Sequence, residues 1–212
     1  MLPPLDRNQV RMMAAEISAR HALPRDLVDD VASRTGGVPL FVEEVTRLLL
    51  EGGEQGSIQS IPPTLQQSLM ARLDRLGTAR EVAQAGSVIG RDFSYSLLRA
   101  LVGAEDAPLK AALERLIEAD ILLVQGSPPE SDYRFKHALI QDAAYENLLK
   151  SRRRILHRRV AEILRDFRPA LAAAEPEALA YHFTQAGLTD AAIEWWGKAG
   201  DQALRGTLPS VP

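Results

Sequence analysis

The residues best placed to contact a small ligand lie in a short corner near the N-terminus, Gly36-Gly37-Val38-Pro39. Glycine suits the position just past a helix end because it readily takes a positive φ. Proline suits the first turn of a helix, where its missing N–H would have no intrahelical partner. Two helices therefore meet here with bare backbone and a rigid apolar ring at the apex. A flat ligand such as a nucleotide base could lie against it, and a plain connector is the alternative.

Motifs that would give the chain an active site of its own are absent from the sequence. There is no Gly-x-x-x-x-Gly-Lys-Ser/Thr phosphate loop, because Gly197-Lys198 is followed by Ala199 within an expected helix. Gly-x-Ser-x-Gly is absent, and no apolar strand ends in an acidic pair that could hold magnesium. Histidine occurs four times without metal-ligand spacing, at His21, His137, His157 and His182. We therefore expect neither catalysis nor a metal site from this chain alone.

Composition is ordinary for a folded protein and limits the classes of partner. The 212 residues are 46% hydrophobic and 25% charged, which suits one large or two small domains. A net charge of -3 argues against a protein built to coat nucleic acid. Cysteine is absent, which excludes disulfides and is compatible with a reducing compartment. No apolar run approaches the ~20 residues of a membrane span, and the start lacks signal-peptide regions, so we expect a cytoplasmic protein without membrane contact.

The N-terminal part, residues 1–52, predicts three helices. Asp6 can cap a helix that runs to about His21, and a second runs from about Pro24 to Arg34. The third, Val38 to Glu51, carries apolar residues at helical spacing. Residues 53–60 are rich in glycine and polar residues and predict a linker.

The middle part, residues 61–168, predicts a winged helix with trailing helices. Helical patterns are expected near Leu65–Leu76, over Ala79–Ile89, Tyr95–Val102 and Ala107–Ala119, and again over His137–Leu149 and Ser151–Phe167. Ile121–Val124 and Tyr133–Lys136, separated by a Gly-Ser-Pro-Pro turn, predict a β-hairpin. Three helices followed by a hairpin is the plan of a winged helix.

The C-terminal part, residues 169–212, predicts an alanine-rich connector and one helical hairpin. Pro176–Ala186 and Thr189–Leu204 flank Gly187, and small residues alternate with bulky ones along both helices. This pattern is typical of a helical-repeat hairpin, and a stable array usually needs at least ~3 repeats. Trp195-Trp196 could form a ligand platform, a core contact or a surface for a following repeat.

Three segments resemble one family of signalling proteins. The run 34–44, Arg-Thr-Gly-Gly-Val-Pro-Leu-Phe-Val-Glu-Glu, resembles the lid corner of STAND signalling ATPases, which are relatives of the AAA+ class. Residues 61–74 and 87–93 resemble the winged-helix region of bacterial members, which are often joined to adenylate/guanylate cyclase domains and tetratricopeptide-like repeats. Residues 135–145, Phe-Lys-His-Ala-Leu-Ile-Gln-Asp-Ala-Ala-Tyr, are the strongest match. The segments occur in the family's order and span nearly the whole chain.

The resemblance implies a nucleotide switch. In this family ADP or ATP binds between a P-loop core, a helical lid and a winged helix, and the repeats sense the input. It implies a mainly α fold with one small β-hairpin: a helical lid (1–52), a winged-helix domain (61–168) and the first tetratricopeptide-like hairpin (169–212). The expected partners are a P-loop ATPase core, in the same or a separate chain, and proteins bound by the repeats. Alone, the chain is expected to have no ATPase or cyclase activity and at most weak affinity for ATP or ADP.

The resemblance also assigns Gly37, Pro39 and His137 as candidate nucleotide-binding residues, and Arg34 is a fourth candidate because of its placement beside the turn. Gly37 and Pro39 match the corner whose proline packs against adenine, and Arg34 could sense the γ-phosphate or simply favour a helix C-terminus. His137 matches the histidine that reaches the ADP phosphates, where a helix start also offers free N–H groups. Relatives with the best-known form of this motif have Asp where this chain has Ala138. His137 could instead cap its helix or pack beneath the wing.

Two other functions compete with this hypothesis. A DNA-binding regulator would use Ala107–Ala119 as its reading helix, but Lys110 and Arg115 there alternate with acidic residues. The basic run at 152–154 with Arg158-Arg159 could contact phosphates or be a solvated helix face. A helical-repeat interaction scaffold is the third possibility, and its support is one helical hairpin.

Overall fold

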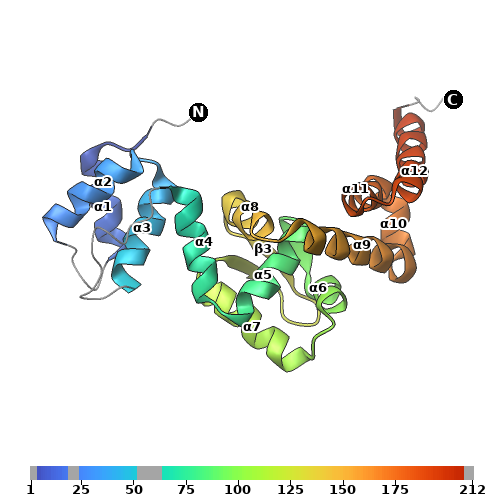
Figure 1. The fold of residues 1–212 in the computed structure, drawn as a ribbon, viewed down its shortest axis with the longest axis horizontal. Coiled ribbons are helices and arrows are strands. Elements are labelled where there is room, and N and C mark those ends of the chain that lie inside the picture. Colours follow the sequence, from blue (N-terminus) through green and yellow to red (C-terminus); the bar gives the residue numbers. More distant parts are fainter. Residues whose placement is uncertain (1–3, 19–23, 52–63, 208–212) are drawn as a thin grey trace. The chain divides into compact units, whose positions relative to one another are not determined.

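The computed structural model describes residues 4–18, 24–51 and 64–207 (Figure 1). These residues form a mainly helical fold with one small antiparallel sheet, which confirms the fold class predicted from the sequence. The chain divides into two compact units, unit 1 (Met1–Arg75) and unit 2 (Leu76–Pro212). The predicted linker, residues 53–60, lies outside the described residues.

The described residues of unit 1 form four helices. They are α1 (Arg7–Ile17), α2 (Arg25–Thr35), α3 (Pro39–Glu51) and α4 (Leu65–Arg75). Asp6 caps α1 as predicted: its Oδ1 accepts hydrogen bonds from the N–H groups of Asn8 (2.8 Å) and Gln9 (2.9 Å), and the Gln9 side chain accepts from the Asp6 N–H. The core of the unit is aliphatic and aromatic, and its buried members are Val10, Val31, Phe41, Val42, Val45 and Leu49.

Helix α4 belongs to unit 1, whereas the sequence analysis placed it with the winged helix. Leu65 packs against the unit 1 core, and Arg72 forms a buried ion pair with Glu44 of α3. Helix α4 therefore buries both an apolar and a charged side chain against unit 1. These tertiary contacts, which its position in the sequence does not reveal, assign it to this unit.

Unit 2 begins with the helices and strands that the sequence analysis predicts as a winged helix. In chain order they are α5 (Thr78–Ile89), β1 (Asp92–Ser94), α6 (Tyr95–Val102), α7 (Asp106–Glu118), β2 (Leu122–Gln125) and β3 (Asp132–Phe135). The strands form an antiparallel sheet of order β1-β3-β2 in which Leu122 pairs with Phe135 and Asp92 with Arg134. The predicted hairpin is therefore present and gains a third strand.

Strand β1 was not predicted, because three residues are too few to show an alternating pattern. It is held by its central side chain, Phe93, whose ring centroid stacks 5.9 Å from that of Tyr133 on β3. The same ring presses against Gly86 of α5, where an added Cβ would lie 2.8 Å from the Phe93 ring. The small residues of α5 thus allow the close packing that the sequence indicates.

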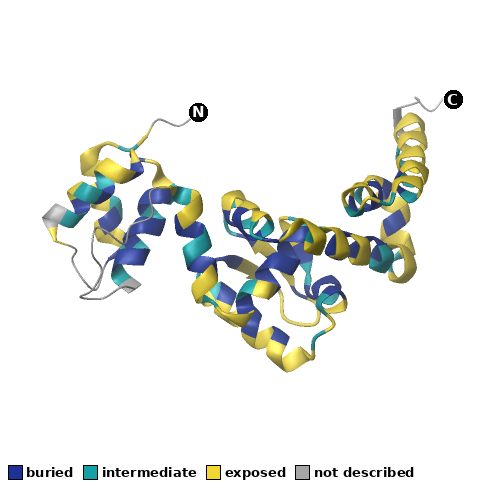
Figure 2. Cartoon of the chain, in the orientation of Figure 1, coloured by how far each residue is buried: buried dark blue, intermediate teal, exposed yellow. Residues whose placement is uncertain are grey.

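The rest of unit 2 is helical. Its elements are α8 (Ala138–Glu146), α9 (Lys150–Phe167), α10 (Pro169–Ala174), α11 (Pro176–Ala186) and α12 (Thr189–Thr207). The predicted connector after α9 is the short helix α10, which starts at Pro169 and is otherwise mostly alanine. Helix α11 packs against both α9 and α12, and α12 is exposed along most of its length (Figure 2).

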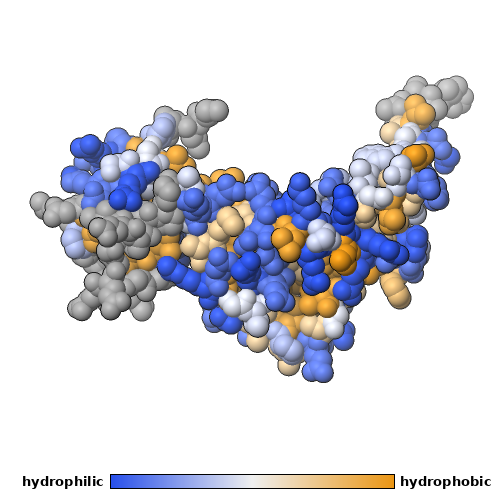
Figure 3. All heavy atoms as spheres, in the orientation of Figure 1, coloured by the Kyte–Doolittle hydropathy of each residue, from blue (hydrophilic) through white to orange (hydrophobic). Residues whose placement is uncertain are grey.

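The surface of the chain is mixed. Figure 3 shows hydrophilic and hydrophobic residues interspersed over the visible face of unit 2. Among the helices that the structure describes, none combines the length and the hydropathy needed to cross a membrane.

Candidate functional site

The corner between α2 and α3 has the conformation that its glycines allow. Gly36 closes α2 in the left-handed region (φ 57°, ψ 21°), and Gly37 follows with φ 74°. The Val38 N–H donates to the Thr35 carbonyl (3.1 Å), and α3 begins at Pro39. The predicted helix–turn–helix corner is therefore present in unit 1.

Gly37 has a second constraint that the sequence did not reveal. An ideal Cβ on Gly37 would lie 2.2 Å from the Leu5 carbonyl oxygen, and the Leu5 N–H donates to the Gly37 carbonyl (2.8 Å). Gly37 is buried by this contact. Its role in the structure is to bring the residues before α1 against the corner, which fixes the orientation of its neighbours.

Three side chains next to Gly37 in the corner are exposed to solvent. Pro39 is exposed at the start of α3, and Val38 is 44% exposed. Arg34 is exposed in the last turn of α2. The corner thus offers an apolar ring, an apolar side chain and a guanidinium within six residues, which suits a planar ligand that also carries negative charge.

His137 lies in unit 2 at the junction of β3 and α8. It is the N-cap of α8 with extended backbone (φ -131°, ψ 141°), and its carbonyl accepts from the N–H groups of Ile140 (3.1 Å) and Gln141 (3.4 Å). Its side chain is half-buried and makes no capping hydrogen bond. At this position the His137 backbone caps α8. Side-chain capping therefore does not explain why a histidine occurs here.

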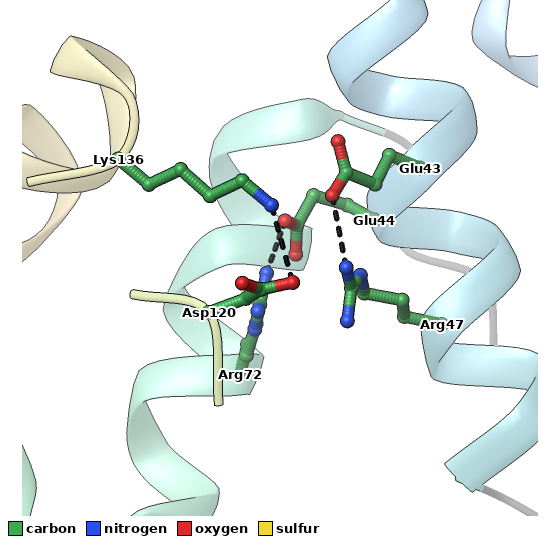
Figure 4. Close-up of polar contacts among 6 residues, drawn as sticks. All are labelled: Glu43, Glu44, Arg47, Arg72, Asp120 and Lys136. Atoms are coloured by element: carbon green, nitrogen blue, oxygen red, sulfur yellow. Dashed lines mark hydrogen bonds and ion pairs between the residues drawn. The ribbon is translucent and has the colours of Figure 1, made fainter. Parts of the chain in front are cut away.

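His137 is next to a lysine and to a helix start without an acidic residue. Lys136 precedes it and forms an ion pair with Asp120 (3.1 Å; Figure 4), while the Lys136 N–H donates to the Ile121 carbonyl (3.0 Å). The first turn of α8 has no acidic residue, and Ala138 is exposed. The positive end of the helix dipole is thus not neutralised by a carboxylate of its own first turn, which favours an anion.

The four predicted residues fall into two groups. Arg34, Gly37 and Pro39 share one corner of unit 1, and His137 belongs to unit 2. Each group has the local geometry expected of it, an exposed ring at a glycine corner and a histidine at a helix start.

A buried ion pair joins α3 and α4 in unit 1, and sequence reasoning missed it. Glu44 (1% exposed) pairs with Arg72 (5% exposed), while the neighbouring Glu43 pairs with Arg47 at 3.1 Å (Figure 4). Burial raises the pKa of Glu44, although Arg72 opposes this effect. The sequence signal was Glu44 itself, a carboxylate three residues after Phe41 and four before Leu48 on the apolar face of α3.

A second unpredicted cluster lies in unit 2, where α8, α9 and α11 meet. His157 and His182 are 1% and 4% exposed, and their Nδ1 atoms are 2.8 Å apart. His157 Nε2 is 3.0 Å from the hydroxyl oxygen of Tyr145. Burial lowers the pKa of His157 to about 4 and that of His182 to about 3, with a smaller contribution from Arg153 on the former and from His157 on the latter. Both rings are therefore neutral at pH 7, and one must donate to the other.

The histidines of this cluster could not be paired from the sequence, because His157 and His182 are separated by 25 residues and lie on different helices. Their positions in the apolar stripes of α9 and α11 were the available signal. In the described parts of the chain, no group of three His, Cys, Asp or Glu side chains is arranged to hold a metal ion.

Comparison with known proteins does not assign the chain to a family. No protein family model matches the chain. The chain is 34% identical, over 95% of its length, to "Uncharacterized protein R02095" of Rhizobium meliloti (strain 1021). The match covers 21% of that protein, so the chain spans about a fifth of the length of this relative.

Proposed function

We propose that this chain is the regulatory lid and winged-helix segment of a nucleotide-switched signalling ATPase of the STAND type, of the kind joined to cyclase domains. The observation that carries the proposal is the corner of unit 1. Gly37 packs against the Leu5 backbone, and the Pro39 ring is exposed directly after it. A rigid apolar ring without a donor is suited to one face of an adenine.

The start of α8 supports the same function from unit 2. His137 follows the last strand of the winged helix, its side chain does not serve as a cap, and the helix start beside Lys136 lacks an acidic first turn. Imidazole nitrogen and backbone N–H groups at such a position are good phosphate donors. In this proposal His137 contacts the ADP phosphates and Arg34 the γ-phosphate of ATP.

The chain itself is non-catalytic in this proposal. ATP or ADP belongs to the complete switch, which requires a P-loop core in the same chain or in a separate one, and the helical hairpin α11–α12 is the start of a region that binds protein partners in the cytoplasm. The length of the Rhizobium meliloti relative, of which the match covers 21%, is compatible with such a multidomain arrangement.

The DNA-reading alternative receives little support from the surface of α7. Its exposed side chains include Lys110 and Arg115 but also Glu114 and Glu118. The turn between β2 and β3, Gly126–Ser131, has no cation. A reading helix and wing normally present basic and amide groups to the grooves and phosphates.

The test combines the chain with a P-loop core. If the reading frame upstream of the Met1 codon encodes a phosphate loop, the two parts are expressed together and the bound nucleotide is measured after purification. We expect the assembly to retain ADP, and Pro39→Ala and His137→Ala each to lower the retained fraction. Met12→Ala and Leu139→Ala, at exposed apolar side chains of unit 1 and unit 2 that have no role in the proposed contact, are the matched controls. Retention that is equal in all four variants would contradict the proposal.

The isolated chain gives an independent check. In calorimetric titration we expect no tight, magnesium-dependent binding of ATP, because the phosphate-cradling core is absent. In gel-shift assays with duplex DNA over a salt series, steep salt-dependent binding would favour the DNA-reading function instead.

A further inference from the structure

A cationic cavity lies in unit 2 between the start of α9 and the end of α11. Its volume is about 350 Å³, and its lining includes Lys150, Arg153, Arg154, Tyr145, Thr184 and Gln185. Three of the lining side chains are cations and none is a carboxylate. This cavity is at the opposite end of α8 from His137, so it is distinct from the nucleotide contact proposed above.

The charges at this end of α9 oppose the helix dipole. Cations destabilise the N-terminal turn of a helix, where acidic residues are preferred. Yet α9 begins with Lys150, carries three arginines at 152–154, has no acidic residue in its first turn and has no side-chain cap. Farther along the helix, Arg158 pairs with Glu162. Among the described residues, Lys150 and Arg154 have no ion-pair partner.

Arg153 holds the cavity wall in place. Its Nε donates to the Leu148 carbonyl (3.0 Å) and its Nη2 to the Glu146 carbonyl (2.6 Å), so it ties the end of α8 to the start of α9. Its guanidinium also lies 4.5 Å from the centre of the Tyr145 ring. The tyrosine is therefore oriented by a cation before any ligand arrives.

Tyr145 connects the cavity to the buried histidine pair. Its hydroxyl can donate to His157 Nε2 when His157 donates from Nδ1 to His182. In the other tautomer His182 Nδ1–H donates to His157 Nδ1, His157 Nε2–H donates to the Tyr145 oxygen, and the Tyr145 O–H is free to donate toward the cavity. Each ring carries one proton in both arrangements, so this change needs no net charge in the buried cluster.

We infer that this cavity binds a small ligand through a diphosphate or similar polyanionic group. Lys150 and Arg154 supply positive charge to the ligand. Arg153 adds a third positive charge and orients the Tyr145 ring. The Tyr145 hydroxyl donates a hydrogen bond to the ligand while it accepts one from His157, which in turn accepts one from His182. At the end of α11, the Phe183 and Thr184 carbonyls already accept from Leu188 and Gly187, which limits their repulsion of an anion. A polyanion here would also neutralise the unfavourable N-terminus of α9.

The test uses the full chain and inorganic pyrophosphate, titrated by calorimetry at low salt. We expect saturable binding, weakened at least about tenfold by the double substitution Lys150→Ala/Arg154→Ala, because charge-assisted hydrogen bonds are lost. Arg152→Ala is the matched control: it removes one cation from the same turn but does not line the cavity, and its effect is expected to stay within about twofold. Thermal unfolding checks that all variants fold, since Lys150 and Arg154 are exposed.

Nuclear magnetic resonance of the histidine rings gives a readout that general charge attraction would not move. Pyrophosphate should shift the ring-nitrogen signals of His157 and His182 in the native chain and leave them unchanged in Lys150→Ala/Arg154→Ala. No saturable binding, an equal loss in Arg152→Ala, or unmoved histidine signals would each overturn the inference.

Competition separates the sources of the polyanion. Displacement of pyrophosphate by ADP at lower concentration than by inorganic phosphate points to a nucleotide, and the reverse order points to a free phosphate ion. If duplex DNA binds through Lys150 and Arg154 and pyrophosphate fails to compete, the small-ligand inference is wrong. Because His137→Ala should leave pyrophosphate binding intact, this test can fail or succeed independently of the proposed nucleotide switch.

Discussion

Gly36 and Gly37 are adjacent, but the structure constrains them differently. Both have positive φ, at 57° and 74°. A Cβ on Gly36 would meet open space, whereas one on Gly37 would collide with the Leu5 carbonyl. The sequence identified the helix-ending role of this pair from local chemistry, but the contact with Leu5 depends on tertiary structure and left no local pattern.

Gly37→Ala should therefore destabilise unit 1 much more than Gly36→Ala. For Gly36→Ala we expect a loss of about 1 kcal/mol from the left-handed backbone alone. For Gly37→Ala the added clash should bring the loss to roughly 2–4 kcal/mol. Urea unfolding of the two variants measures the difference, and equal losses would show that Leu5 does not pack against the corner in solution.

Glu44 gives a pH dependence of known sign. Its pKa in the folded chain is raised above the ordinary value of 4.5, so the folded state binds a proton more readily than the unfolded state. The resulting stabilisation is present below about pH 4.5 and is lost as pH rises through the folded pKa. Glu44→Gln removes this titration. The stability of Glu44→Gln relative to the native chain should therefore increase from pH 4 to pH 8 in urea unfolding, and a constant difference would contradict it.

At the scale of elements, the histidine pair couples α11 to α9. The pKa values of His157 and His182 are lowered from 6.5 to about 4 and about 3. For a lowered pKa, the stabilisation is complete above the unfolded value of 6.5 and is lost as pH falls toward the folded values. Acidification from pH 6.5 to 4 should thus loosen the contact between α9 and α11, in the opposite pH direction from Glu44.

Tryptophan fluorescence can follow this transition selectively. The chain has two tryptophans, and both Trp195 and Trp196 lie in α12, which packs on α11. An acid-induced change in their emission should move to lower pH in His182→Phe, which keeps a ring of similar shape but cannot be protonated. An unchanged acid midpoint in this variant would show that the pair does not control the docking of α11.

Periodic elements were predictable from the sequence, and elements held by tertiary contacts were not. The apolar stripe of α3 and the capping residue Asp6 gave their helices within a few residues. Strand β1 exists because Phe93 stacks on Tyr133, and α4 belongs to unit 1 because Arg72 pairs with Glu44. The same division applies to the candidate sites: the glycine corner and His137 had local signals, whereas the cationic cavity is assembled from α8, α9 and α11, and its basic run at 152–154 was its one local signal.

At the scale of the molecule, the two units carry separate halves of the proposed nucleotide contact. Unit 1 supplies an exposed proline ring, and unit 2 supplies a histidine at a helix start whose first turn has no acidic residue. Neither half contains a phosphate-binding loop, so each provides only a few contacts to a ligand. In the proposed switch, this division makes nucleotide binding sensitive to the relative placement of the units, because only an arrangement that directs both halves to one ligand gives full affinity.

The outer face of α12 gives the last prediction. Ile193, Trp196 and Leu204 are 65%, 49% and 66% exposed, and they recur at helical spacing around Gly197 and Gly200, whose Cβ positions face open space. Exposed apolar side chains that share one face of a helix favour association. Sedimentation velocity of the chain should therefore show concentration-dependent association that Ile193→Glu/Leu204→Glu abolishes.

Leu149→Glu, at a residue 76% exposed outside this face, is the matched control and should leave association unchanged. A chain that stays monomeric at high concentration would show that Trp196, whose indole N–H bonds Thr184 (3.1 Å), and its neighbours are tolerated as an ordinary solvent-exposed surface.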